Sequence, residues 1–319
     1  MSGEALCAAV GETPLVELQL PDRLGPNVRL FGKLECVLPG GSLKDRPVLR
    51  IVREGLRRGD LDGERRLLDS SSGNAGIAYA WIGAALGVPV TLVVPGNASA
   101  ERLARIRAYG AELILTDPIE GYDHAIHTAR RLAAEQPDRY WYADQYGNDD
   151  NWRAHHDGTG AEILAQVETI TGRAPDALVI GVGTGGSLTG IGRRLRAANP
   201  DLHITSVVPE IFPGIEGLKP LGHDGDLVPA ILDESLIDRR VEVTLDEAIG
   251  AARQIAGQGL FVGPSAGAYV HAACDLAAEG VVGGGPHGET ILVTLLCDTG
   301  ERYVSTGMWG GAGAQRPVR

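Results

Sequence analysis

The chain has 319 residues, of which 44% are hydrophobic, and it carries a formal net charge of -12. This length suits two domains of ordinary size, and the negative charge speaks against nucleic acid or an anionic membrane surface as the main partner. Four cysteines without metal-ligand spacing or a secretory framework, no signal-peptide pattern and no membrane-length apolar run together predict a cytoplasmic protein with reduced thiols.

The first predicted elements surround a lysine. Residues 15–20 alternate and residues 28–34 form a short apolar run, so both segments predict strands. Apolar residues then recur at helical spacing over 47–56. Residues 40–42, Gly-Gly-Ser, supply a permissive turn and a candidate N-cap just ahead of Lys44.

Lys44 therefore stands at the predicted start of a helix. The helix dipole disfavours a cation at that end, so it lowers the pKa of the lysine and makes the amine a better nucleophile near neutral pH. The alternative is an exposed ion pair with Asp45 or Glu35, which is the commoner role of an isolated Lys-Asp-Arg sequence.

Strands and helices alternate along the rest of the chain. In a first series, strands are expected at 67–69, 88–94 and 112–115, and helices at 75–86, 100–109 and 123–135. In a second series, helices are expected at 158–170, 188–198, 245–258 and 265–278, and strands at 177–181, 203–208 and 290–296. This alternation predicts an α/β fold with a mostly parallel sheet in each series. The irregular segment 137–151 is the predicted boundary, and a ligand is expected between the sheets, at the carboxyl ends of their strands.

Residues 181–187, Gly-Val-Gly-Thr-Gly-Gly-Ser, directly follow one predicted strand and precede a helix. Glycines allow successive backbone N–H groups to converge on an anion, with the helix N-terminus behind them. The sequence matches neither the P-loop nor the dinucleotide-binding fingerprint. It predicts a phosphate site, and the alternative is a turn that is merely tightly packed.

Two further turns of small residues also precede helices. Residues 70–76, Ser-Ser-Ser-Gly-Asn-Ala-Gly, offer hydroxyl, amide and N–H groups that suit a carboxylate, with an elaborate N-cap as the alternative. Residues 263–268 place Ser265 at a helix start, where capping is the simpler explanation. A nucleophilic lysine, a phosphate site, a carboxylate loop and an isolated serine together predict a pocket for an amino acid on pyridoxal phosphate.

Five motifs in order along almost the whole chain resemble the cysteine synthase (O-acetylserine sulfhydrylase) family of fold-type II pyridoxal-phosphate enzymes. They are Gly11-Glu12-Thr13-Pro14-Leu15-Val16, Ser42-Leu43-Lys44-Asp45-Arg46, Ser71-Ser72-Gly73-Asn74-Ala75-Gly76, Gly183-Thr184-Gly185-Gly186-Ser187 and Asp298-Thr299-Gly300-Glu301-Arg302-Tyr303. The resemblance implies a tryptophan synthase β-like architecture of two domains, each with a mostly parallel twisted sheet flanked by helices. Residues 46–152 would form the smaller, mobile substrate-carboxylate domain, and residues 1–45 with 153–319 the larger one, which holds the cofactor phosphate.

The resemblance also implies a role for each candidate site residue. Lys44 would hold pyridoxal phosphate as a Schiff base and later move the α-proton, Asn74 would bond the ring hydroxyl oxygen, and Ser265 would face the pyridine nitrogen. The cofactor phosphate would be bound by Gly183, Thr184, Gly185, Gly186 and Ser187. The substrate carboxylate would be bound by Ser71, Ser72, Gly73, Ala75 and Gln145. A neutral hydroxyl at the pyridine nitrogen favours reactions in which a β-substituent leaves.

The activity that the resemblance implies is β-replacement. An O-activated L-serine, O-acetyl- or O-phosphoserine, would pass through an aminoacrylate and give L-cysteine with a sulfur nucleophile. Ala75 departs from the family, which usually has threonine there. The segment 209–221, where family members sense the leaving group, contains no arginine, so Lys219 is the candidate phosphate ligand, with an exposed lysine beside Glu216 as the alternative.

Three other functions stay open at this point. An amine nucleophile would give a diaminopropionate-type amino acid, and a serine or threonine dehydratase would release the intermediate without a nucleophile. A scaffold that only partners a serine acetyltransferase would need neither Lys44 nor its loops. The family implies a homodimer, with a sulfur-carrier protein or serine acetyltransferase as candidate partner and no metal; His155 and His156 lack a third ligand at suitable spacing.

Overall fold

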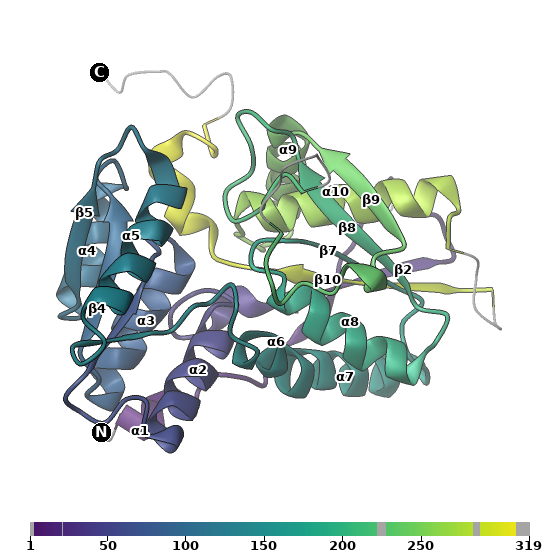
Figure 1. Ribbon diagram of the computed structural model, residues 1–319. Helices are drawn as coiled ribbons and strands as arrows, with labels where there is room; N and C mark the ends of the chain where they lie inside the picture. Colours follow the sequence, from purple (N-terminus) through teal and green to yellow (C-terminus); the bar gives the residue numbers. More distant parts are fainter. Residues whose placement is uncertain (1–2, 21, 222–227, 283–287, 311–319) are drawn as a thin grey trace.

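The computed structural model describes residues 3–20, 22–221, 228–282 and 288–310. Its strands form two separate sheets with helices packed against them, which confirms the α/β prediction (Figure 1). A six-stranded sheet has the order β1-β2-β10-β7-β8-β9, and a four-stranded sheet has the order β5-β4-β3-β6. Among the described strands every pair is parallel except β1 with β2, which is antiparallel.

The strands are short and mostly buried. Those of the six-stranded sheet are β1 (Leu15–Glu17), β2 (Val28–Leu34), β7 (Ala177–Gly181), β8 (His203–Pro209), β9 (Arg239–Val243) and β10 (Thr290–Leu296). Those of the four-stranded sheet are β3 (Arg66–Asp69), β4 (Val90–Pro95), β5 (Glu112–Thr116) and β6 (Tyr140–Tyr142).

Helices connect the parallel strands, as βαβ units require. They are α1 (Gly3–Cys7), α2 (Asp45–Arg58), α3 (Asn74–Leu86), α4 (Ala100–Ala108), α5 (Gly121–Glu135), α6 (Asp150–Ala154), α7 (Ala161–Thr171), α8 (Gly186–Ala198), α9 (Leu245–Ala256) and α10 (Pro264–Glu279). A π-helical turn (His155–Gly160) joins α6 to α7, and 3-10 turns occur at Glu35–Val37, Glu234–Leu236 and Gly300–Thr306. In the part of the chain that the structure describes, no helix is long and apolar enough to span a bilayer.

The sequence analysis missed two strands. The segment 137–151, expected to be irregular, contains β6, which pairs with β3 at the edge of the four-stranded sheet, and the start of α6. Strand β9 was not predicted either, because its sequence, Arg-Arg-Val-Glu-Val, carries three charges. This strand lies at the edge of the six-stranded sheet. Edge strands commonly carry charge because it blocks pairing with other chains, and that charge hides their apolar pattern.

Strand ends bring the predicted loops together. The loops that follow β3, β7 and β10 all leave from the carboxyl ends of their strands, where ligand sites of parallel sheets occur. The turn before α2 is attached to the end of β10 through backbone contacts. The Leu43 N–H donates to the Cys297 carbonyl at 2.9 Å, and Ser42 pairs with Asp298 in an isolated antiparallel β-bridge. The lysine turn therefore lies beside the last strand, although about 250 residues separate them in sequence.

Candidate active site

Lys44 is the N-cap residue of α2 and lines a cavity of about 290 Å³. Burial lowers the pKa of its amine from 10.5 to about 8. The direction agrees with the sequence analysis, but burial is the main cause, whereas the helix dipole was the cause proposed there. The expected alternative, an ion pair with Asp45 or Glu35, is not formed within the described chain, because Asp45 accepts hydrogen bonds from the Gly40 N–H and the Trp81 indole and Glu35 binds Arg46.

The loop after β3 lines one wall of this cavity with residues 71–75. It is tightly folded: a Cβ at Gly76 would lie 2.0 Å from the Ser71 carbonyl oxygen, so only glycine fits there. The Gly73 N–H donates to the Ser71 hydroxyl at 3.3 Å, and α3 begins at Asn74. Hydroxyls and the free N–H groups of a helix start then face the cavity, which suits a carboxylate.

Gln145 completes this wall from another segment. Its backbone N–H donates to Asp69 Oδ2 at 3.3 Å, and its side-chain amide donates to the Ser70 carbonyl at 3.3 Å. Asp69 also accepts the Ser70 N–H at 2.7 Å, so one buried carboxylate holds both parts of the wall. Burial raises the pKa of Asp69 to about 7.

The glycine-rich turn after β7 forms the opposite wall, where Gly183 and Thr184 line the cavity. Gly185 has a φ of 86°, which favours glycine, and a Cβ at Gly183 would lie 2.6 Å from the Gly217 carbonyl oxygen. Helix α8 starts directly afterwards, so its first-turn N–H groups point toward an anion bound in the turn. Gly185, Gly186 and Ser187 do not line the cavity and belong to the helix start behind it.

Asn151 connects the two walls, and the sequence analysis did not find it. Its side-chain amide donates to Thr184 Oγ1 at 3.1 Å and to the Gln145 carbonyl at 2.7 Å. It also lies against the start of α8, because a Cβ at Gly186 would be 2.0 Å from Asn151 Oδ1. No local motif marks this asparagine, since its role depends on two loops that are distant in sequence.

The mouth of the cavity is lined by aromatic and charged side chains. Arg102, from the first turn of α4, forms an ion pair with Glu216, and Lys219 Nζ lies 4.9 Å from the centre of the Tyr146 ring. Tyr303 lies at the same mouth. Lys219 was predicted as a site residue, whereas Arg102 was missed because it lies outside every motif.

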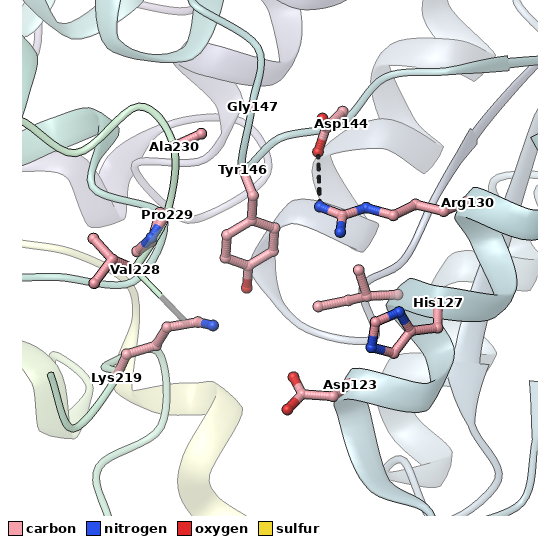
Figure 2. Close-up of a pocket in the computed structure, with 11 residues that line it drawn as sticks. Asp123, His127, Arg130, Asp144, Tyr146, Gly147, Lys219, Val228, Pro229 and Ala230 are labelled. Carbon is pink, nitrogen blue, oxygen red and sulfur yellow. Dashed lines mark ion pairs between the residues drawn. The ribbon is translucent and has the colours of Figure 1, made fainter. Parts of the chain in front are cut away.

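A second cavity of about 220 Å³ adjoins the first through Tyr146 and Lys219, which line both (Figure 2). Charged and polar side chains from α5 and from the Asp144 turn face it. Arg130 Nη2 lies 3.8 Å from Asp144 Oδ1. This cavity lies beside the site rather than between its two walls.

The neighbouring histidines, His155 and His156, contact different groups. Buried His155 has its Nδ1 at 3.0 Å from the Thr159 hydroxyl, whereas His156 has its Nδ1 at 2.8 Å from Asp157 Oδ1. Among the residues that the structure describes, no cluster of three His, Cys, Asp or Glu side chains is arranged to hold a metal ion.

Comparisons with known proteins decide the family. The family described as "Pyridoxal-phosphate dependent enzyme" matches residues 6–298. Cysteine synthase of Aquifex aeolicus is 43% identical over 310 residues, covering 96% of this chain and 92% of that protein. The chain belongs to the cysteine synthase family of pyridoxal-phosphate enzymes.

Solved structures of the family agree with this fold. A crystal structure of cysteine synthase (OASS) from Entamoeba histolytica is 32% identical in sequence, with a TM-score of 0.84. The match covers 97% of this chain and 93% of the Entamoeba chain. A crystal structure of O-ureido-L-serine synthase is 34% identical with a TM-score of 0.86, covering 98% of this chain and 96% of its own. The chain therefore has the fold-type II architecture over nearly its whole length.

The residues of this cysteine synthase family member fit pyridoxal phosphate, the family's cofactor. The cradle at Gly183, which a Cβ would fill, and the start of α8 suit the phosphate. The Asn74 amide donates one hydrogen bond to Asp298 at 2.7 Å, which fixes its orientation and leaves its second N–H for a ligand. Ser265 is buried at the start of α10 and is not among the residues lining the cavity.

Proposed function

We propose that this enzyme replaces the β-substituent of an O-activated L-serine, O-acetyl- or O-phosphoserine, with a sulfur nucleophile and so makes L-cysteine. One observation carries the proposal: Lys44, with its lowered pKa, lines one cavity together with the hydroxyl- and N–H-rich loop 71–75 and the glycine-rich turn at Gly183 and Thr184. The cysteine synthases among its relatives support the choice of sulfur as nucleophile.

Each wall of the cavity has a separate task. Pyridoxal phosphate, when bound, supplies the electron sink for chemistry at the α- and β-carbons. Lys44 Nζ would bind the cofactor aldehyde and, once the substrate amine has displaced it, take the α-proton. Residues 71–75 and Gln145 would hold the substrate carboxylate, and Gly183 and Thr184, with the start of α8 behind them, the cofactor phosphate. Ser265 would face the pyridine nitrogen with a neutral hydroxyl.

We further propose that residues 46–152, which contain the four-stranded sheet, act as the smaller, mobile domain and close over the substrate. Residues 1–45 and 153–319 would form the larger domain. Helix α4 carries Arg102 on the smaller part, and Glu216 is on the larger part, so their ion pair crosses the cavity mouth. Closure there would exclude water from the reacting atoms.

An amine or another non-sulfur nucleophile is the second candidate. The observation in its favour is the likeness to O-ureido-L-serine synthase, whose name describes a β-substituted product made without sulfur. The carboxylate and phosphate walls do not distinguish these nucleophiles, because neither wall touches the incoming group. The two candidates are distinguished by adding sulfide and amines together to enzyme that has already reacted with the donor and measuring which product forms.

We also propose that the enzyme acts as a homodimer in the cytoplasm, with a sulfur-carrier protein or serine acetyltransferase as partner. All four cysteines, Cys7, Cys36, Cys274 and Cys297, are free thiols, which suits a reducing compartment. Light scattering on a sizing column tests the dimer, and co-elution with either partner tests the complex.

A spectral titration tests the activity. Purified enzyme loaded with pyridoxal phosphate is mixed with O-acetylserine and, separately, with O-phosphoserine, and sulfide is then added. We expect at least one donor to change the visible spectrum and sulfide to restore it while L-cysteine accumulates. The Lys44→Ala variant is the control and should form no cysteine. If neither donor changes the visible spectrum of the wild-type enzyme, the proposal is contradicted.

A further inference from the structure

Another cavity, of about 340 Å³, is lined by α4 and by the 3-10 turn Gly300–Thr306. Its lining includes three arginines, Arg102, Arg105 and Arg302, together with two glutamates and three hydroxyl side chains. Helix α4 belongs to the proposed smaller domain and the 3-10 turn to the proposed larger one, so the cavity lies where the two domains meet. None of the roles assigned above uses this cavity.

Two of these arginines share a single acceptor. Arg105 Nη2 donates to the Gly40 carbonyl at 3.2 Å, and Arg302 Nη2 donates to the same oxygen. This neutral oxygen, at the start of the lysine turn, therefore holds two guanidinium cations next to each other. Burial lowers the pKa of Arg302, the charge of Asp298 opposes that shift, and the charge of Arg105 adds to it.

No carboxylate pairs directly with these two cations. Within the described ranges, neither Arg105 nor Arg302 forms an ion pair, and the two glutamates of the cavity are exposed. Buried Asp45 and Asp298 accept hydrogen bonds from other groups instead. The third arginine, Arg102, is already paired with Glu216 at the mouth of the cavity that contains Lys44.

Several donors around this cavity have no acceptor in the part of the chain that the structure describes. Arg302 Nε and Nη1 are buried without a hydrogen-bond partner, and Arg105 donates only its bond to Gly40. The Thr299 hydroxyl oxygen accepts the Glu301 N–H at 3.4 Å, which leaves the hydroxyl proton to be donated. A buried cation without a counter-charge is costly, so the lining of this cavity suits an anion.

We propose that this cavity binds a doubly charged tetrahedral oxyanion, of the sulfate or phosphate class, between Arg105 and Arg302. A guanidinium presents parallel N–H donors that match two oxygens of such an ion, and two cations balance its two charges. The ion links α4 to the 3-10 turn and so joins the two domains beside the lysine turn. Neither Arg105 nor Arg302 lines the cavity that contains Lys44, and the inference does not depend on the proposed reaction.

Calorimetric titration tests the inference. Enzyme loaded with pyridoxal phosphate, whose phosphate turn is then filled, is titrated with sulfate and, separately, with phosphate, and sodium chloride keeps the ionic strength constant. We expect one ion of either kind to bind per chain. Arg105→Gln should weaken binding about tenfold or more, because a charged donor is lost.

Two matched variants locate the ion. Arg107→Gln, at an exposed position of the same helix, and Lys219→Gln, at the mouth of the other cavity, should both bind the ion like wild-type enzyme. Three results would overturn the inference: no saturable binding by wild-type enzyme, equal affinity in Arg105→Gln, or an equal loss in Lys219→Gln, which would place the ion at the active-site mouth.

Thermal melting gives a second measurement. Sulfate stabilises many proteins because it is excluded from their surfaces, so the difference between variants is the informative quantity. A bound ion adds stabilisation by mass action, and the rise in melting temperature should therefore be larger in wild-type enzyme and Arg107→Gln than in Arg105→Gln. If Arg105→Gln does not fold, Arg105→Lys takes its place, since lysine keeps the charge but not the parallel donors. Equal rises in wild-type enzyme and the Arg105 variant reject the inference.

Discussion

Burial lowers the pKa of the Lys44 amine, and this predicts a measurable pH dependence. Its pKa is lowered from 10.5 to about 8, so the neutral amine that attacks an aldehyde rises about tenfold per pH unit up to pH 8 and then levels off. We expect the rate at which apoenzyme takes up pyridoxal phosphate to follow this curve. The growth of the visible absorption band after mixing, from pH 6.5 to 10, measures it.

The control for this prediction is Nα-acetyl-lysine mixed with pyridoxal phosphate at the same pH values, which corrects for ionisation of the aldehyde itself. The ratio of the enzyme rate to the control rate should be highest below pH 8 and fall above it. A ratio that stays constant up to pH 10 would mean that Lys44 behaves as an exposed lysine.

At the scale of elements, Asn151 in α6 joins the cavity wall that contains Gln145 to the wall that contains Thr184. Asn151→Ala removes its hydrogen bonds to Thr184 and to the Gln145 carbonyl and leaves both acceptors without that donor. We expect the Kd for pyridoxal phosphate and the KM for the amino-acid donor to rise about five- to tenfold each, at roughly 1 kcal/mol per lost bond. Fluorescence titration of apoenzyme and steady-state kinetics measure the two effects.

A matched variant separates this role from general loss of stability. Asn199 donates a similar bond, 2.9 Å long, to the Pro175 carbonyl far from the cavity. Asn199→Ala should therefore lower the melting temperature by a comparable amount and leave both the Kd and the KM unchanged. If Asn151→Ala behaves like Asn199→Ala, the asparagine is structural only.

The elements that could be predicted from sequence are those with local signals. Strands 28–34 and 290–296 appear in the structure with the expected bounds, because both are short segments in which most residues are apolar and buried in the sheet. The glycine and serine turns were also predicted from local signals, because the residues that favour a helix start or a tight turn are adjacent in sequence. Asn151 and Arg102 carry no such signal, because each acts on groups that only the tertiary fold brings near.

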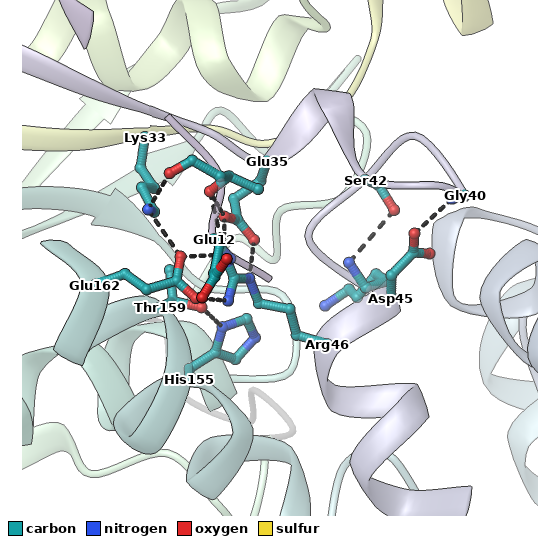
Figure 3. Close-up of polar contacts among 12 residues, drawn as sticks. Glu12, Lys33, Glu35, Gly40, Ser42, Asp45, Arg46, His155, Thr159 and Glu162 are labelled. Atoms are coloured by element: carbon teal, nitrogen blue, oxygen red, sulfur yellow. Dashed lines mark hydrogen bonds and ion pairs between the residues drawn. The ribbon is translucent and has the colours of Figure 1, made fainter. Parts of the chain in front are cut away.

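At the scale of the whole molecule, a network of ion pairs joins strand β2 and the turn that follows it to helices α2 and α7 (Figure 3). Arg46 of α2 donates to Glu35 at 2.6 and 2.8 Å and to Glu162 of α7 at 2.6 and 2.8 Å. Lys33 of β2, fully buried, also lies 2.8 Å from Glu162. Buried charges of this kind remain stable only when each has its partner, so loss of one partner is costly.

The network predicts how stability depends on pH. Burial alone would raise the pKa of Glu162, but hydrogen bonds and charges from Arg46 and Lys33 outweigh it and lower the pKa to about 2. A carboxyl whose folded pKa is lowered stabilises the fold above its ordinary pKa of 4.5, and this contribution is lost as the pH falls from there toward 2. Glu162→Gln should therefore cost about 2 kcal/mol at pH 7 and progressively less below pH 4.5.

Urea unfolding of wild-type and variant enzyme at pH 7, 4 and 3 measures that difference. Glu135→Gln is the control: it breaks an exposed pair with Arg131 one helical turn away and should change the free energy of unfolding by less than about 0.5 kcal/mol at every pH. Because Glu162 holds Arg46, two residues after Lys44, the variant should also slow cofactor uptake if the network positions the lysine turn. A gap between wild type and Glu162→Gln that stays constant down to pH 3 would show that the charge of Glu162 does not support the fold.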